Sequence, residues 1–111
     1  MDVEKKNIQM RKGVIELCIL SLVSRGEMYS TDLLKALKNE KLLVVEGTVY
    51  PLLTRLKNEG LLKYRWEESH TGPPRKYYSL TDIGSGVLEK LEKNWNELAK
   101  SVNIILKNKK S

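Results

Sequence analysis

The sequence contains a single cysteine and a single histidine, and this scarcity excludes several kinds of protein. Cys18 cannot form a disulfide within the chain, and its apolar neighbours indicate a small buried side chain in a reducing compartment. His70 follows a different pattern, because it lies in a turn rich in glycine and proline, where we expect a solvated loop residue. No glycine-rich phosphate loop is present either, so the sequence predicts no enzyme, no metal site and no cofactor.

Long apolar runs, internal repeats and low-complexity tracts are also missing. The apolar run at residues 14–23 is too short to span a bilayer, and the basic residues ahead of it are not followed by a small-residue cleavage site. A chain of 111 residues is long enough to bury one core. We therefore expect one soluble, cytoplasmic unit that makes no contact with a membrane.

Positive charge, in contrast, is in excess, with a formal net charge of +6 and a pI near 9.4. The surplus lies at the two ends of the chain and in residues 47–80, whereas residues 14–46 are slightly acidic. This distribution favours an anionic polymer as partner, although surplus charge also serves solubility.

Residues 47–60 predict a helix with one buried side and one polar side. The apolar residues Val49, Leu52, Leu53 and Leu56 follow the spacing i, i+3, i+4 and i+7. If Gly47 or Thr48 is the N-cap, Pro51 falls in the first turn, where its missing N–H has no acceptor to lose. Gly60 then ends the helix.

The polar side of this helix carries small, hydroxylic, amide and cationic groups. Such groups can dock against the base edges and phosphates of a DNA groove, while an ordinary solvated surface helix is the alternative interpretation. The candidate DNA-binding residues on this side are Tyr50, Pro51, Thr54, Arg55, Lys57 and Asn58.

Two helices are predicted ahead of it. We expect a flexible N-terminus at residues 1–10, with structure beginning near Arg11. The helix that follows includes Val14–Val23 and ends at Gly26; because it is almost entirely apolar, it should be covered by its own domain and by a second subunit, with Leu17 at the interface.

The second predicted helix is capped by Ser30 and runs through Glu40. Its leucines form a narrow inward stripe, and its charged residues face outward. Residues Leu42–Val45 then form a short apolar linker to the central helix.

An alternating pattern after the central helix predicts a β-hairpin. Apolar and polar residues alternate at 62–67 and again at 76–80, on either side of a turn-rich segment at 70–74. We expect Gly72, Pro73 and Pro74 at the tip, flanked by Arg75 and Lys76, which can reach phosphates beside a groove. Basic hairpin tips also occur on proteins that bind nothing.

The last predicted helix covers residues 82–106 and is capped by Thr81. Its apolar residues repeat at intervals of three and four, which forms a heptad seam roughly 25 Å long. A small domain cannot easily cover such a seam, so we expect a homodimer, with Ile83 and Val87 packing back on the domain. The seam consists of Leu88, Leu91, Trp95, Leu98, Val102 and Ile105.

These elements predict a mainly α protein with a small β-hairpin. Residues 11–81 would form a winged helix-turn-helix DNA-binding domain, residues 82–106 a long C-terminal dimerisation helix, and residues 107–111 a basic tail. The corresponding function is sequence-specific binding of double-stranded DNA. A winged-helix dimer that binds protein without DNA is the alternative, because the fold alone does not fix function.

Two motifs carry a resemblance to a known family. Residues 46–61 read Glu-Gly-Thr-Val-Tyr-Pro-Leu-Leu-Thr-Arg-Leu-Lys-Asn-Glu-Gly-Leu, and residues 72–84 read Gly-Pro-Pro-Arg-Lys-Tyr-Tyr-Ser-Leu-Thr-Asp-Ile-Gly. From about Arg11 to Ile105 the chain resembles the PadR family of bacterial transcriptional regulators, in the smaller subfamily with a single C-terminal helix. The resemblance implies a dimeric repressor acting on a pseudo-palindromic operator. It places Thr48, Tyr50, Pro51 and Arg55 on the recognition helix and Arg75 and Lys76 on the wing.

Some members of that family respond to small aromatic or lipophilic compounds. The resemblance therefore implies a candidate ligand pocket between the C-terminal helices, at Trp95. In a symmetric dimer two indoles can meet and offer flat apolar faces to an aromatic cation. Simple packing in the seam is the alternative role for this side chain.

Overall fold

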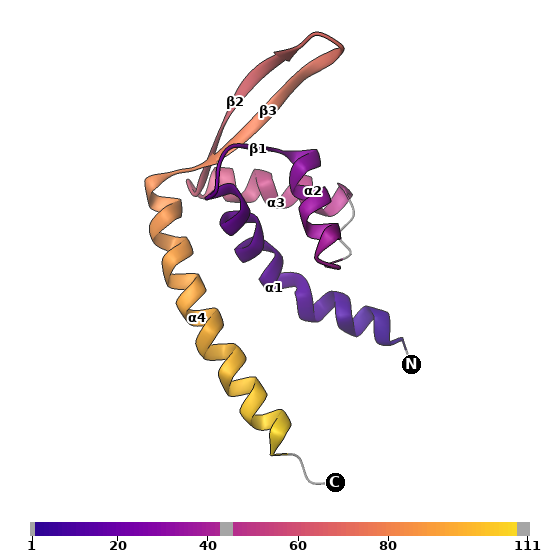
Figure 1. The fold of residues 1–111 in the computed structure, drawn as a ribbon, viewed down its shortest axis with the longest axis vertical. Helices are drawn as coiled ribbons and strands as arrows, with labels where there is room; N and C mark the ends of the chain where they lie inside the picture. The colour runs from indigo at the N-terminus through magenta and orange to yellow at the C-terminus, as the bar shows by residue number, and fades with distance from the viewer. Residues whose placement is uncertain (1, 43–45, 109–111) are drawn as a thin grey trace.

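Four helices and a three-stranded sheet make up the part of the protein that the computed structural model describes, residues 2–42 and 46–108 (Figure 1). In chain order they are α1 (Val3–Val23), β1 (Met28–Tyr29), α2 (Ser30–Asn39), α3 (Glu46–Asn58), β2 (Leu62–Ser69), β3 (Gly72–Leu80) and α4 (Asp82–Lys107). The predicted fold class, mainly α with a β-hairpin and a long C-terminal helix, is confirmed.

The molecule is elongated, because elements project from both ends of a small body. The hairpin of β2 and β3 extends at one end, and α4 and the N-terminal half of α1 extend at the other (Figure 1). The Cα radius of gyration is 16.3 Å, compared with about 13 Å for a compact domain of this length. Much of the projecting surface is therefore not covered by the chain itself.

The core lies where the first three helices meet the base of the hairpin. Its buried side chains are Ile15, Ile19, Leu20 and Val23 of α1, Leu33 and Leu37 of α2, Val49, Leu53 and Leu56 of α3, and Leu62 and Tyr78 of the sheet. The predicted apolar stripe of α3 is confirmed, with Leu52 partly buried at its edge. A helix anchored on this side holds its opposite side rigidly toward solvent.

The prediction that structure begins near Arg11 is wrong, because α1 starts at Val3 and includes most of the segment predicted to be flexible. The carboxylate of Asp2 accepts hydrogen bonds from the backbone N–H groups of Glu4 and Lys5, at 3.0 and 3.3 Å. This N-cap satisfies donors that a helix start otherwise leaves unpaired. Two turns further on, Arg11 lies 3.5 Å from the Glu4 carboxylate.

The region between α1 and α2 also differs from the prediction. Ser30 is not the N-cap of α2 but its first residue, and Tyr29 precedes it as the cap. Tyr29 and Met28 form β1, which pairs antiparallel with β3 and completes a sheet of order β1-β3-β2. A two-residue strand has no periodicity that a sequence could reveal.

α3 starts earlier than predicted. Gly47 and Thr48 lie inside the helix, and Pro51 lies in its second turn, so the carbonyl oxygen of Gly47 receives no hydrogen bond from position 51. Residues 43–45 of the predicted linker lie outside the described residues. The helix stops as predicted: Gly60 has φ of +80°, and the N–H of Leu61 donates to the carbonyl oxygen of Leu56 at 3.0 Å.

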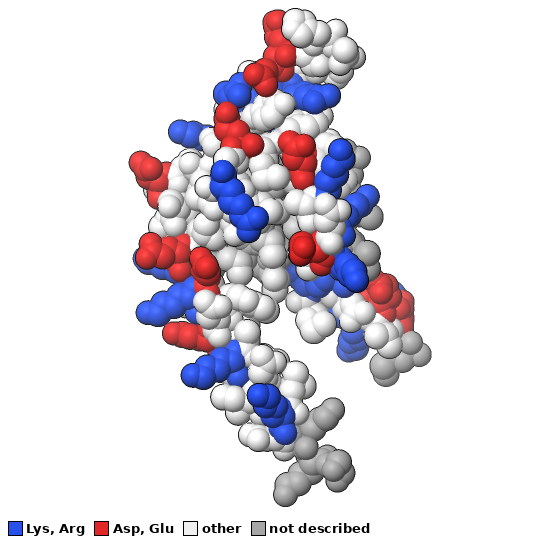
Figure 2. Space-filling view, viewed as in Figure 1, with Lys and Arg blue, Asp and Glu red and all other residues white. Residues whose placement is uncertain are grey.

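The hairpin has the predicted alternation but a different tip. Leu62 is paired with Leu80, Tyr64 with Tyr78 and Trp66 with Lys76, so these side chains share one face. The turn consists of residues 70–71, and Gly72, Pro73 and Pro74 belong to β3 instead of the tip. The reason is the register, in which Ser69 pairs with Gly72 after a bulge. Acidic side chains lie close to the tip (Figure 2).

α4 begins at the predicted cap but is buried differently near its start. Leu88 and Leu91 pack against the core of the same chain, whereas Ile83, predicted to pack there, is 67% exposed. Val87 is partly buried. Heptad spacing identifies the apolar stripe but not which end of it rests on the domain. Within the described residues, no helix combines the length and the apolar character needed to cross a membrane.

Candidate nucleic-acid interface

The exposed side of α3 is the centre of the candidate interface. Tyr50, Pro51, Thr54 and Asn58 are exposed and line a shallow hollow together with Arg55 and Glu59. Thr48 is exposed one turn before Pro51. The structure thus brings the predicted groups together on one surface, opposite the buried stripe of the same helix.

Tyr50 is held in position by the preceding helix. The buried hydroxyl of Ser30, at the start of α2, donates to the phenol oxygen of Tyr50 at 3.3 Å. Ser30 therefore positions Tyr50 on the surface of α3. The sequence analysis predicted Ser30 as a helix cap and did not predict this contact. The two residues are 20 positions apart, so no local pattern signals it.

Arg55 does not point freely into solvent. Its Nε and one terminal nitrogen lie 3.1 and 2.8 Å from Oε1 of Glu16, which belongs to α1. An exposed pair of this kind adds little stability. Its effect is to join α1 to the exposed side of α3 and to offset part of the charge of Arg55, whose other terminal nitrogen is not part of this contact.

Two lysines converge on one aromatic ring between α3 and the hairpin. The ammonium of Lys57 lies 5.8 Å from the ring centroid of Tyr64, and that of Lys76 lies 4.5 Å from the same centroid. Lys76 is also 5.2 Å from the ring of Trp66. Residues of α3 and of the hairpin therefore form one continuous surface. The sequence analysis predicted the two lysines as part of the interface but not the aromatic residues.

Arg75 lies on the opposite face of the hairpin from Lys76, since consecutive strand residues point to opposite faces. Its guanidinium carbon is 4.9 Å from the ring centroid of Tyr29. On the same face, Arg65 contacts the carboxylate of Glu27 at 2.7 Å and that of Glu67 at 3.5 Å. The hydrogen bond from Arg65 lowers the pKa of the Glu27 carboxyl, so Glu27 stays ionised and offsets the charge of Arg65.

The predicted seam is open in the single chain beyond its first two residues. Trp95 is 40% exposed, and Leu98, Val102 and Ile105 are exposed as well. Leu17 of α1 is partly buried. Most charged side chains of α4 lie on the side turned away from α1, while its side toward α1 is mainly uncharged (Figure 2). This apolar surface extends over the projecting half of the helix.

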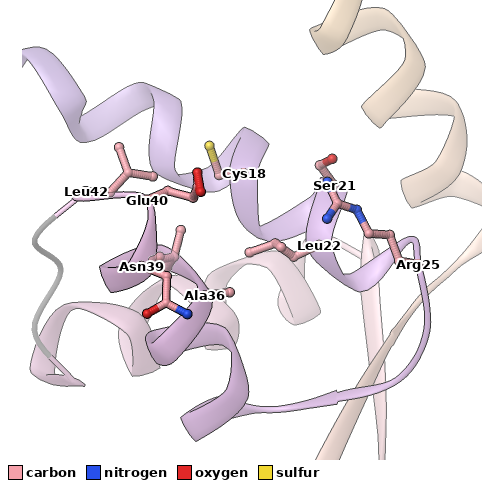
Figure 3. A pocket seen from close by; sticks show the side chains of 9 residues that line it. Cys18, Ser21, Leu22, Arg25, Ala36, Asn39, Glu40 and Leu42 are labelled. Carbon is pink, nitrogen blue, oxygen red and sulfur yellow. The ribbon is translucent and has the colours of Figure 1, made fainter.

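A cavity of about 500 Å³ lies between α1 and α2. Cys18 and Glu40 lie at one end, Ser21 and Arg25 at the other, with Leu22 between them (Figure 3). Burial raises the pKa of the Cys18 thiol, which keeps it protonated and unreactive near neutral pH. The sequence analysis predicted the partial burial of Cys18 but not the cavity, because α1 and α2 meet through residues distant in sequence.

Comparison with known proteins gives consistent matches. The model of the transcriptional regulator PadR-like family matches residues 19–90. The chain is similar to a PadR-like transcription factor from Bacteroides fragilis, with 53% identity, coverage of 94% of this chain and 99% of that one, and a TM-score of 0.76. It is also similar to a PadR family regulator from Eggerthella lenta, with 33% identity, coverage of 96% and 94%, and a TM-score of 0.86. A PadR-like regulator from Bacillus cereus is 40% identical, with coverage of 91% and 99% and a TM-score of 0.79.

Proposed function

This chain belongs to the PadR-like family of transcriptional regulators, which are not enzymes, and from this membership we propose that it is a sequence-specific DNA-binding repressor. The observation that supports the proposal most directly is the exposed polar side of α3. Hydroxyl and amide groups at Tyr50, Thr54 and Asn58 suit the donors and acceptors of base edges in a major groove. A bacterial repressor bound to its operator would act in the cytoplasm.

In the proposed interface, some residues contact bases and others contact phosphates. Thr48, Tyr50 and Thr54 would discriminate between sequences, with Asn58 and the apolar surface of Pro51 beside them. Lys57, Arg75 and Lys76 would contact phosphates, which contribute affinity without sequence information. Arg55 would join them with part of its charge offset by Glu16.

We propose that the working form is a homodimer held along α4. A two-fold dimer presents two copies of α3, and so fits a pseudo-palindrome whose half-sites lie about one turn of DNA, or a multiple of it, apart. Selecting bound fragments from the source genome tests this directly. Enriched fragments should share such a pseudo-palindrome, and their binding should weaken as salt rises. If no fragment is enriched while a protein partner is retained, the alternative of a protein-interaction module holds instead.

Thr54→Ala and Arg75→Ala separate the two kinds of contact. We expect Thr54→Ala to reduce the preference for the selected site by about 1–3 kcal/mol, since a base contact is lost. Arg75→Ala should weaken binding to all sequences alike. It should also reduce the salt slope, which is the slope of log K against log salt concentration, by about one in magnitude. Mobility shifts of selected and scrambled duplexes at several salt concentrations measure both effects. An Arg75→Ala protein that loses only its preferred site would contradict this division.

We further propose that a small aromatic or lipophilic effector releases the repressor by binding at Trp95. The indole is 40% exposed in the seam, and two of them across a symmetric dimer would offer stacking faces. In a Trp66→Phe background, planar dyes should quench Trp95 saturably. The same dyes should weaken DNA binding, because the binding of effector and of DNA are thermodynamically linked. An unquenched Trp95 across a broad panel of such compounds would leave it with a packing role only.

A further inference from the structure

An exposed row of aromatic side chains lies on the face of the hairpin that turns toward α3. The ring of Tyr64 lies 5.8 Å from that of the buried Tyr78, and the ring of Trp66 lies 6.1 Å from Tyr64 at an interplanar angle of 87°. The row thus starts at the core and ends in solvent, where Trp66 is 59% exposed. Such a large exposed indole on a rigid strand is poorly explained by packing within the chain.

Two positive charges accompany this row without acidic partners. Lys57 and Lys76 approach the ring of Tyr64 from different elements, at 5.8 and 4.5 Å from its centroid. Among the described residues, neither ammonium forms an ion pair with a carboxylate, whereas Arg65 and Arg55 are both engaged by glutamates. The ring attracts each cation, but the cations repel each other, so an anion placed between α3 and the hairpin is favoured by both.

The row continues toward the tip as an apolar surface. Trp66, Pro73 and Pro74 line a shallow hollow together with Glu68. Flat apolar surface beside paired cations matches the backbone of a DNA strand, whose phosphates are anionic and whose sugars present apolar faces. The opposite face also holds cations over rings, Arg75 over Tyr29 and Arg65 over Tyr77. Both of those rings are only partly exposed, however, and Arg65 is paired with Glu27 and Glu67.

We propose that Tyr64 and Trp66, together with Lys57 and Lys76, hold one strand of the DNA backbone between α3 and the hairpin. The two lysines bind phosphate oxygens, and the ring of Trp66 packs on the apolar face of the deoxyribose beyond them. The contact is independent of sequence, since every nucleotide offers these groups. This inference rests on the proposed DNA binding and extends it by assigning the strand to one face of the hairpin and by adding the aromatic pair.

Fluorescence of Trp66 tests the contact. In a Trp95→Phe protein, first shown to bind DNA as the wild type does, Trp66 is the one remaining tryptophan. Titration with the selected duplex and with a scrambled duplex should quench its emission saturably in both cases. Trp66→Ala should raise Kd for both duplexes roughly tenfold without changing the salt slope, because stacking releases no counterions. Trp66→Phe, which keeps a ring, should recover most of this loss.

The lysines give an independent measurement. Replacing Lys57 and Lys76 together by alanine should reduce the salt slope by about 1.8, the value for two lost phosphate contacts. Lys63→Ala is the matched control for one charge, because Lys63 lies on β2 but on the opposite face and pairs with Ser79 across the sheet. Its slope should stay close to that of the wild type.

Three results would overturn the inference. Trp66 emission that stays constant while both duplexes bind would remove the aromatic contact, and a slope change in the double lysine variant no larger than that in Lys63→Ala would remove the two lysines from the contact. Quenching by an acidic polypeptide such as polyglutamate, but by neither duplex, would assign the surface to a protein partner. Failure of the unmutated protein to bind any duplex is a separate outcome, since it refutes the proposed function itself.

Discussion

Replacement of Gly84 by alanine is expected to lower the free energy of unfolding by about 3 kcal/mol, because no space exists for a methyl group at that position. A Cβ there would overlap the carbonyl oxygen of Leu61 and lie 2.9 Å from its carbonyl carbon. It would also lie 3.0 Å from Cδ1 of Leu80. The obstacle is mainly backbone, which cannot rotate away as a flexible side chain can.

This close approach fixes the start of α4 against the turn that follows α3. The hydroxyl of Thr81 donates to the carbonyl oxygen of Gly60 at 2.6 Å and accepts from the N–H of Gly84 at 2.9 Å. The backbone N–H of Thr81 donates to the carbonyl oxygen of Leu61 at 3.1 Å. The direction of α4 relative to α3 is thereby set by a few short contacts.

Gly86→Ala is the matched control for this prediction. Gly86 lies on the same helix two residues further on, and nothing lies within 4 Å of a Cβ built there. The substitution should raise stability by up to about 1 kcal/mol, because alanine is the better helix former. Chemical denaturation of both variants at one protein concentration measures the difference. Equal stabilities would mean that α4 does not approach Leu61 as closely as the structure shows.

Local periodicity predicted the elements that bury one clear face. The stripe of Val49, Leu53 and Leu56 gave α3 and its exposed side, and alternation in the hairpin put Tyr64 and Trp66 on one face. The same alternation is a signal for the aromatic row, whereas the predicted interface included only the basic residues near the tip.

The features that were missed depend on contacts between distant residues or on short segments. Arg55 and Glu16 are 39 positions apart, and no local pattern joins them. The early start of α1 depends on the cap at Asp2. The prediction of a flexible N-terminus did not take this cap into account. In α4, heptad spacing cannot distinguish Leu91, which rests on its own domain, from Leu98, which does not.

The difference between Leu91 and Leu98 determines how the proposed dimer should be tested. A lysine at position 91 would disturb the core of the single chain as well as any interface. Leu98 and Val102 are 57% and 44% exposed in the single chain, so lysines there leave the protomer intact. In a dimer joined along α4, the same lysines would place uncompensated charges in a buried seam.

The double variant Leu98→Lys/Val102→Lys is therefore expected to be a folded monomer by sedimentation. Its affinity for the selected operator should fall at least about 100-fold, because each α3 would then bind its half-site without the advantage of a linked partner. Asn96→Lys/Asn103→Lys adds the same charge to exposed positions on the other side of α4, and should remain dimeric with full affinity.

This pair of variants also separates assembly from charge. Both add positive charge, which by itself favours DNA, so a loss of affinity confined to Leu98→Lys/Val102→Lys can come only from the lost partner. A Leu98→Lys/Val102→Lys protein that still sediments as a dimer would exclude α4 as the interface. The exposed apolar residues of α1, Val3, Ile8 and Met10, would then be the surface to test.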